Sequence, residues 1–178
     1  MTIETKIQDN FLDKTTFDNM QKFMLSFNFP WFMTSFLTEK EHLQNGLYYS
    51  SNSDHLQFTH VFYNNYGATS QYFESIILPI LDKIKPISLI KVKANLITRT
   101  NERVIFNYHH DVELYDNVPI TTGIIYLNTN NGKTMFDDGT EIDSVANRFL
   151  SFDADISHTG TTCTDEKCRC LINFNYII

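Results

Sequence analysis

The sequence has no apolar run of the about 20 residues that a membrane-spanning helix needs. Its first residues, 1 to 6, also lack the apolar stretch of a signal peptide. Only three cysteines are present, Cys163, Cys168 and Cys170, and an odd number in one short segment does not suit the disulfide framework of a secreted protein. These absences predict a protein without membrane association, and we expect a cytoplasmic location.

Basic residues are scarce as well. The chain has 14 lysines and arginines against 21 aspartates and glutamates, which gives a formal net charge of -7 at pH 7. Binding to nucleic acid depends on clustered cations that release counterions from phosphates, so this charge disfavours nucleic acid as a partner. Six basic residues fall between Lys83 and Arg103, a run that fits a solvated face better than a binding stripe.

Linkers and internal repeats are absent too, because no Pro/Gly/Ser-rich stretch divides the 178 residues. A chain of this length buries roughly two-thirds of its unfolded surface on folding and needs no disulfide or structural metal to be stable. We therefore expect one domain over residues 1–178. The 15 phenylalanines and 9 tyrosines favour β-structure and aromatic packing.

Two stretches in the N-terminal half have apolar residues at helical spacing. The first predicts an amphipathic helix, capped by Asp13 or Thr15 and ended before Pro30. Its apolar residues are Phe17, Met20, Met24 and Phe27. Residues 29–32 are expected to dock this helix on the core as an aromatic plug, with the wall of a substrate groove as the alternative. Residues 70–84 predict a second helix with a kink at Pro79.

Beyond residue 87 the apolar period changes to two, which is typical of strands. The predicted strands are 87–98, 103–112, 120–127, 133–136, 148–153 and 168–177. An earlier strand at 56–63 places His60 on an apolar face, either as a satisfied core histidine or as a contact near an active site. Helices followed by strands predict an α+β chain, mainly β, with a sandwich or barrel in its C-terminal two-thirds.

A His-His-Asp sequence lies in the predicted strand 103–112. Alternate side chains share one face of a strand, so His109 and Asp111 point together while His110 points away. With His158 they form a set of two histidines and one carboxylate, which leaves three positions of an octahedral Fe(II) open. A hydrogen-bonded core pair is the alternative interpretation of His109 and Asp111.

Further elements follow in order: Tyr126-Leu-Asn128, Gly132-Lys-Thr134, His158 and Arg169. With the His-x-Asp motif they resemble the Fe(II)/2-oxoglutarate-dependent dioxygenases, and within these the prolyl-4-hydroxylase-like branch. The resemblance runs from about Lys91 to Ile178. It implies a double-stranded β-helix (jelly-roll) core over residues 87–178, covered by a helical support region over residues 1–86. Asn131 stands where prolyl hydroxylases usually carry a glycine, which puts the shape of that turn in doubt.

The resemblance also implies the ligands. Fe(II) would be held by His109, Asp111 and His158, with 2-oxoglutarate chelating the metal and dioxygen taking the last position. Arg169 would anchor the distal carboxylate of 2-oxoglutarate through its always-charged fork. Tyr126 would add a hydroxyl to the same carboxylate.

Asn95 is the candidate for a further contact to the co-substrate, because the family often places a polar residue on the strand ahead of the His-x-Asp motif. Alternation puts Asn95 on the face of Lys91 and Lys93, so an exposed polar position is the competing interpretation. The cysteines raise a zinc site as an alternative for the C-terminal segment. Their spacing lacks the paired Cys-x2-Cys of structural zinc sites, and a strand face in the packed core fits Cys168 and Cys170 better.

The function implied by the resemblance is hydroxylation of a C-H bond, in the first place of a prolyl residue in a peptide or protein. The alternatives are the same chemistry on a free amino acid, another small molecule or a nucleobase. An alternative of a different class is a non-catalytic cupin-like module that binds a metal or a small acid. Arg169 discriminates between these classes, because a cupin metal site needs no buried arginine for a distal carboxylate.

Overall fold

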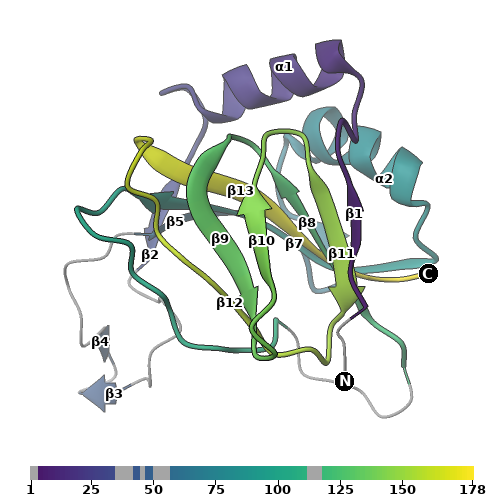
Figure 1. Cartoon of the computed structure of the whole chain (residues 1–178). Coiled ribbons are helices and arrows are strands. Elements are labelled where there is room, and N and C mark those ends of the chain that lie inside the picture. The colour runs from purple at the N-terminus through teal and green to yellow at the C-terminus, as the bar shows by residue number, and fades with distance from the viewer. Residues whose placement is uncertain (1–3, 35–41, 45–46, 50–56, 112–117) are drawn as a thin grey trace.

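Two facing β-sheets form the centre of the protein in the computed structural model, which describes residues 4–34, 42–44, 47–49, 57–111 and 118–178 (Figure 1). The main sheet has the strand order β1-β11-β8-β13-β7-β5-β2, with β6 paired to β5, and the minor sheet has the order β10-β9-β12. A separate hairpin joins β3 (His42–Gln44) and β4 (Leu47–Tyr49).

The strands of the main sheet are β1 (Lys6–Gln8), β2 (Phe32–Thr34), β5 (Gln57–Asn64), β6 (Gly67–Ala68), β7 (Ser88–Thr98), β8 (Thr121–Tyr126), β11 (Phe149–Asp153) and β13 (Cys168–Ile177). Those of the minor sheet are β9 (Asn130–Phe136), β10 (Glu141–Ser144) and β12 (His158–Gly160). Every strand pair in both sheets is antiparallel. The predicted class, mainly β with a jelly-roll core, is confirmed.

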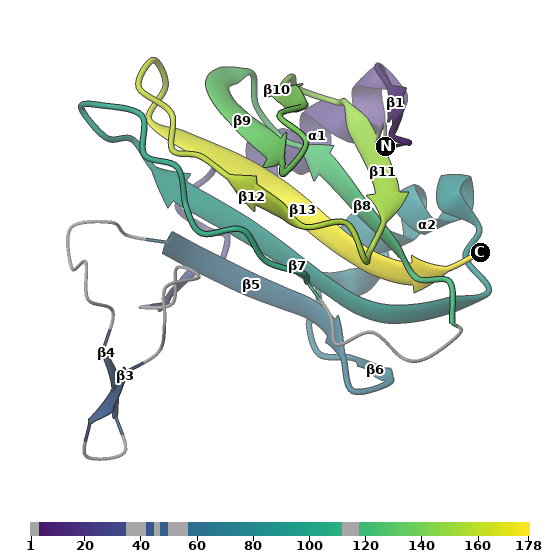
Figure 2. The same cartoon turned by 60° about the horizontal axis from the view of Figure 1, so that its bottom comes forward.

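Alternation along β13 divides the interior into two cores. Cys170, Ile172 and Phe174 face the helices, where they pack with residues of α1 (Lys14–Met24), η1 (Phe73–Ile77) and α2 (Leu78–Ile84). Leu171, which stands between Cys170 and Ile172 in the sequence, packs instead in the smaller cluster between the two sheets. The space between the sheets is therefore reached by alternate residues of β13, which lies between β8 and β7 in the main sheet (Figure 2).

Helix α1 follows its predicted amphipathic pattern at its start but ends earlier. The Asp13 side chain caps it by accepting a hydrogen bond from the Thr16 backbone nitrogen at 3.0 Å, so Asp13 and not Thr15 is the cap. Phe17, Met20 and Met24 are buried. Phe27 is 97% exposed because the helix stops at Met24, and its expected place on the apolar face was wrong.

The aromatic plug forms around Phe29, which is buried and packs on the Trp31 and His60 rings at centroid distances of 4.9 and 4.7 Å. Phe32, by contrast, is 63% exposed and lies outside the plug. His60 is a satisfied core histidine: its ring nitrogens face the Pro30 carbonyl oxygen at 2.9 Å and the Ser70 hydroxyl at 2.8 Å. Burial lowers the pKa of His60.

The predicted helix over residues 70–84 is divided into a π-helical turn, η1, and the α-helix α2. Pro79 lies in the first turn of α2, directly after η1, at the point where the π-helical pattern of hydrogen bonds ends. Ile76, Ile77 and Ile80 are buried against the main sheet, as the apolar stripe predicts. In the described part of the chain, no helix has the length and apolar character of a membrane span.

Two expectations about the strands need correction. The predicted strand 103–112 is absent from residues 103–111, which form only the isolated bridges Ile105 to Thr161 and His109 to His158; residue 112 lies outside the described residues. The first 86 residues are more than a helical support, because β1, β2 and β5 join the main sheet at its two edges. The predicted strand at 56–63 corresponds to β5, and residue 56 also lies outside the described residues.

Candidate functional site

The two histidines of the predicted metal set lie side by side because their backbones pair. The His109 nitrogen donates to the His158 carbonyl oxygen at 2.9 Å, and the His158 nitrogen donates back to the His109 carbonyl oxygen at 3.1 Å. This reciprocal bridge holds the two imidazole rings at a centroid distance of 4.9 Å. The pairing with β12, rather than a regular strand, thus positions His109.

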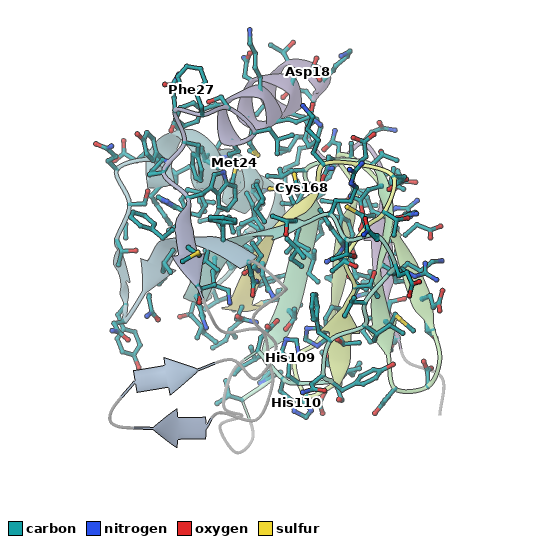
Figure 3. The ribbon with its side chains drawn as sticks, turned by 90° about the vertical axis from the view of Figure 1, so that its left-hand side faces the viewer. Asp18, Met24, Phe27, His109, His110 and Cys168 are labelled. Carbon is teal, nitrogen blue, oxygen red and sulfur yellow. The ribbon has the colours of Figure 1, made fainter. Side chains whose placement is uncertain are left out.

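Asp111 completes the group. Its Oδ1 atom lies 3.7 Å from His109 Nε2, and its Oδ2 atom lies 3.4 Å from His158 Nε2. One ligand atom from each of the three residues lies within 4.8 Å of the others, so the group is able to hold a metal ion. His110 is directed elsewhere, with its Nε2 atom 3.1 Å from the Asp155 carbonyl oxygen. Figure 3 shows His109 at the opposite end of the molecule from Asp18 on helix α1.

Backbone carbonyls set the protonation of both rings. His109 Nδ1 lies 3.1 Å from the Asn107 carbonyl oxygen, and His158 Nδ1 lies 3.1 Å from the Ile156 carbonyl oxygen. A carbonyl oxygen only accepts hydrogen bonds, so each Nδ1 carries a proton, which leaves Nε2 as the nitrogen that a metal would bind. Both Nε2 atoms are on the side of Asp111, as metal ligation by the three residues requires.

Neighbouring groups stabilise the ionised form of the Asp111 carboxyl group. Burial alone would raise the pKa of the carboxyl group, but hydrogen bonding to His109, His158 and Asn173 holds that pKa well below its ordinary value. Burial would lower the pKa of His109, and the hydrogen bond and charge of Asp111 outweigh it, so that pKa is raised. The group therefore offers one carboxylate and two imidazoles, a donor set that fits Fe(II) with open positions.

The buried cation Arg169 lies in the same pocket. Arg169 of β13 is 2% exposed, and its guanidinium donates from Nε to Ser144 Oγ at 2.8 Å and from NH2 to Thr134 Oγ1 at 2.9 Å. Among the described residues no carboxylate forms an ion pair with it. Burial lowers the pKa of Arg169, because a charge taken from water without a counter-ion is costly. An anionic ligand would remove that cost.

Tyr126 lies behind this cation rather than in the pocket. It is fully buried, its hydroxyl pairs with Thr134 Oγ1 at 2.8 Å, and its ring centroid lies 5.7 Å from Arg169 Cζ. Burial raises the pKa of Tyr126, so the phenol stays neutral. Thr134 stands between the tyrosine and the pocket. Contact of Tyr126 with a bound carboxylate stays a prediction. The structure also identifies Ser144 as a partner of Arg169, which no sequence signal indicated.

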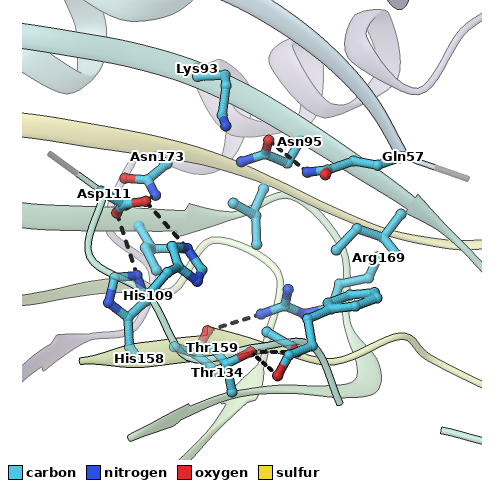
Figure 4. Close-up of a pocket in the computed structure, with 15 residues that line it drawn as sticks. Gln57, Lys93, Asn95, His109, Asp111, Thr134, His158, Thr159, Arg169 and Asn173 are labelled. Atoms are coloured by element: carbon cyan, nitrogen blue, oxygen red, sulfur yellow. Dashed lines mark hydrogen bonds and ion pairs between the residues drawn. The ribbon is translucent and has the colours of Figure 1, made fainter. Parts of the chain in front are cut away.

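The pocket that joins these groups has a volume of about 120 Å³ (Figure 4). Its walls come from β7, β8, β9, β12 and β13, together with the segment before Asp111 and Gln57 of β5. Asn95 lines it and is buried, so the exposed interpretation of Asn95 was wrong; its Oδ1 atom accepts from Gln57 Nε2 at 2.9 Å. Whether Asn95 contacts a co-substrate stays a prediction.

The sequence analysis assigned no role to four polar residues that line this pocket: Gln57, Lys93, Thr159 and Asn173. Lys93 was grouped with exposed lysines because it alternates with Lys91, yet its side chain lies on the pocket face of β7. Burial and the charge of Lys91 lower the pKa of Lys93, and the charge of Asp111 acts in the opposite direction. The sequence did contain one signal for this position, because Lys93 and Asn95 are two residues apart and therefore share one face of the strand.

The cysteines form no second metal site. Cys163, Cys168 and Cys170 are free thiols, and the only cluster of metal-binding side chains among the described residues is the His109, Asp111 and His158 group. Burial raises the pKa of the Cys168 thiol to about 11, which disfavours a thiolate ligand. Cys170 packs in the core under the helices, as its strand position predicts.

Asn173 orients the carboxylate of the metal group, and its loss tests that role. Its Nδ2 atom donates to Asp111 Oδ2 at 2.7 Å. We expect Asn173→Ala to weaken Mn(II) or Zn(II) binding by about 10- to 100-fold, the usual effect of losing a hydrogen bond to a metal ligand. Calorimetric titration of the metal measures it. Asn175→Ala, two residues along β13 and bonded to Thr122, is the matched control and should leave metal affinity unchanged.

Gly132 provides the space that the Arg169 side chain occupies. A Cβ atom at Gly132 would lie 2.6 Å from Arg169 Cδ and 2.8 Å from Asn130 Oδ1, closer than real contacts of a Cβ atom. We expect Gly132→Ala to destabilise the fold by about 1–3 kcal/mol through overpacking and to displace the guanidinium. Thermal unfolding and 2-oxoglutarate titration measure both effects. Gly67→Ala is the control, because no atom lies within 4 Å of the position that a Cβ atom would take there.

Comparison with known proteins gives similarity in structure only. No family model matches the chain, and no curated protein sequence matches it. A prolyl hydroxylase from Trichoplax adhaerens, solved with a peptide fragment of the hypoxia inducible factor oxygen degradation domain, is 13% identical with a TM-score of 0.66, covering 99% of this chain and 84% of that one. A viral collagen prolyl hydroxylase of Paramecium Bursaria Chlorella virus-1, in complex with 2-oxoglutarate, is 12% identical with a TM-score of 0.54, covering 98% and 96%.

A third solved structure with this fold is the epimerase SnoN in complex with Fe3+, α-ketoglutarate and nogalamycin RO. It is 11% identical, has a TM-score of 0.59, and the match covers 98% of this chain and 79% of that one. At such identities the similarity establishes the fold: the chain has the fold of the 2-oxoglutarate-dependent oxygenases, as the sequence resemblance predicts.

Proposed function

We propose that this chain is an Fe(II)- and 2-oxoglutarate-dependent oxygenase that hydroxylates a C-H bond. The observation that supports it most is the buried Arg169 guanidinium, which has no acidic partner among the described residues and shares one pocket with His109, Asp111 and His158. A metal group alone fits many proteins. A metal group and an unpaired buried cation in a pocket of about 120 Å³ fit a small dicarboxylate that spans them.

Each residue has a defined task in this proposal. The Nε2 atoms of His109 and His158 and the Asp111 carboxylate hold Fe(II), whose bound form supplies the activation of dioxygen. Asn173 fixes the Asp111 carboxylate through its 2.7 Å hydrogen bond. Arg169 binds the distal carboxylate of 2-oxoglutarate with its planar fork, while Thr134 and Ser144 fix the orientation of that fork.

The overall reaction consumes 2-oxoglutarate, dioxygen and the substrate C-H bond. One oxygen atom enters succinate, carbon dioxide leaves from the C1 carboxylate, and the second oxygen atom becomes the hydroxyl group of the product. The chain supplies binding, orientation and electrostatics, and the metal supplies the redox chemistry.

For the substrate, we propose a proline ring. Two solved structures with this fold are prolyl hydroxylases, and one of them was solved with a peptide bound. The alternatives to a prolyl residue in a peptide or protein are the same chemistry on a free amino acid, on another small molecule or on a nucleobase, and the net charge of -7 is against the nucleobase. A non-catalytic cupin-like binding module is the alternative of another class, and the buried Arg169 argues against it.

Turnover of the co-substrate tests the proposal. The protein is loaded with Fe(II) without air, mixed with 2-oxoglutarate and exposed to oxygen, and succinate is quantified. We expect succinate only when Fe(II), 2-oxoglutarate and oxygen are all present, and none when Zn(II) replaces Fe(II). Wild-type protein that binds 2-oxoglutarate and metal but never yields succinate, with or without free and peptidyl proline, would favour the binding module.

A further inference from the structure

A second cation lines the pocket, and the proposed chemistry does not use it. Lys93 lies on β7 directly opposite Asn173 on β13, at the end of the pocket that holds the metal group. Figure 4 shows its ammonium directed into the pocket beside Asn95 and Asn173. Among the described residues no acid lies within ion-pair distance of it.

Among the described residues, Asp111 is the one acid that lines the pocket, and its oxygens are already engaged. Oδ1 faces His109 Nε2, and Oδ2 faces His158 Nε2 and accepts from Asn173. In the proposed function, which this inference presupposes, the carboxylate also binds the metal. Burial lowers the pKa of Lys93 and the charge of Asp111 opposes that shift, but Asp111 forms no direct ion pair with the ammonium and its oxygens serve other groups.

The charges of the loaded site point to a missing anion. The two positive charges of Fe(II) and the one of Arg169 balance the single negative charge of Asp111 and the two of 2-oxoglutarate. The histidines are neutral when they bind a metal. Lys93, which is half-buried, then adds one positive charge that no described residue of the pocket balances, and an unbalanced charge partly removed from water is costly.

Two amides beside Lys93 add directional contacts. The Oδ1 atom of Asn173 is a buried acceptor that has no hydrogen-bond partner in the described part of the chain, although most buried polar atoms have one. The Asn95 amide gives its oxygen to Gln57, which leaves its Nδ2 group as a donor facing the pocket. The metal end of the pocket thus offers a cation and a donor for a carboxylate, and an acceptor for an N-H group.

We propose that Lys93 binds the α-carboxylate of the substrate and that Asn173 Oδ1 accepts from its amino or imino nitrogen. The substrate class is then a free α-amino or imino acid, such as proline itself, rather than an internal residue of a peptide. An internal residue has neither a free carboxylate nor a charged nitrogen. Lys93 is a specificity-determining residue in this account.

Calorimetry on the assembled site tests this without turnover. The protein is loaded with Mn(II), saturated with 2-oxoglutarate in the absence of air, and titrated with each of the twenty free protein amino acids, beginning with L-proline. We expect at least one to bind, its carboxamide to bind about 30-fold more weakly or worse, and Lys93→Met to cause the same loss. Lys91→Met removes a like charge from the same strand outside the pocket and should retain the affinity within about threefold.

The outcomes separate this inference from the function on which it rests. If Lys93→Met loses 2-oxoglutarate affinity instead, Lys93 serves the co-substrate and the inference is overturned. Absence of binding by every amino acid, with 2-oxoglutarate still bound, also overturns it and leaves the proposed function standing. Failure of the wild-type protein to bind Mn(II) and 2-oxoglutarate would remove both.

Discussion

Arg169→Met is expected to weaken 2-oxoglutarate binding by about 30-fold or more, because truncating one partner of a buried charge pair typically costs roughly 2–5 kcal/mol. The substitution keeps most of the side-chain volume and removes the fork. Because Arg169 has no acidic partner among the described residues, its charge lowers the stability of the ligand-free protein. We therefore expect the ligand-free variant to unfold at a temperature no lower than wild type, while losing the stabilisation that 2-oxoglutarate gives.

Arg148→Met is the matched control. Arg148 pairs with Asp9 at 2.6 Å on the surface, away from the pocket, so its loss should leave 2-oxoglutarate affinity unchanged. Calorimetric titration of the Mn(II)-loaded variants and thermal unfolding with and without 2-oxoglutarate measure both effects. Equal affinity in wild type and Arg169→Met would show that the distal carboxylate binds elsewhere. A large loss of stability in ligand-free Arg169→Met would show that the arginine serves the fold.

Asp111→Ala is expected to reduce metal affinity by more than about 100-fold, beyond the effect of losing a second-sphere contact. The substitution removes the only carboxylate of the metal group and leaves two neutral imidazoles. Succinate formation should fall to the background of metal-free protein. Mn(II) titration followed by succinate measurement under saturating Fe(II) separates loss of binding from loss of turnover.

An exposed aspartate provides the comparison for that variant. Asp153 at the end of β11 is exposed, so Asp153→Ala removes the same charge without touching the pocket. It should retain wild-type metal affinity. An Asp111→Ala protein that binds Mn(II) as tightly as wild type would mean that the three residues are a structural cluster and not a metal site.

The spacing of apolar residues predicted most helices and strands, because burial of one face of an element enforces that spacing. Phe17, Met20 and Met24 fall on one face of α1, and alternation along β13 places Arg169 and Asn173 on the side opposite Cys170. The end of α1 was harder to predict, since nothing in the apolar spacing of Phe27 shows that the chain leaves the helix at Met24.

The candidate site shows more clearly what the sequence could not predict. The proximity of His109 and Asp111 was derived from a regular strand, yet residues 103–111 form only isolated bridges, and the pairing of His109 with His158 brings the groups together. Long-range pairing of this kind has no local sequence signal. The pocket residues Gln57 and Lys93 were missed for the same reason, because their faces become buried only when the minor sheet covers the main one.

The fate of oxygen tests the central claim most directly. Fe(II)-loaded protein is supplied with 2-oxoglutarate and 18O-labelled dioxygen in unlabelled water, and the succinate is analysed by mass spectrometry. An oxygenase with this site predicts succinate that carries one labelled oxygen atom in the wild-type protein and no succinate in Asp111→Ala. Unlabelled succinate, or labelled succinate formed equally by Asp111→Ala, would contradict the assignment of His109, Asp111 and His158 as its metal centre.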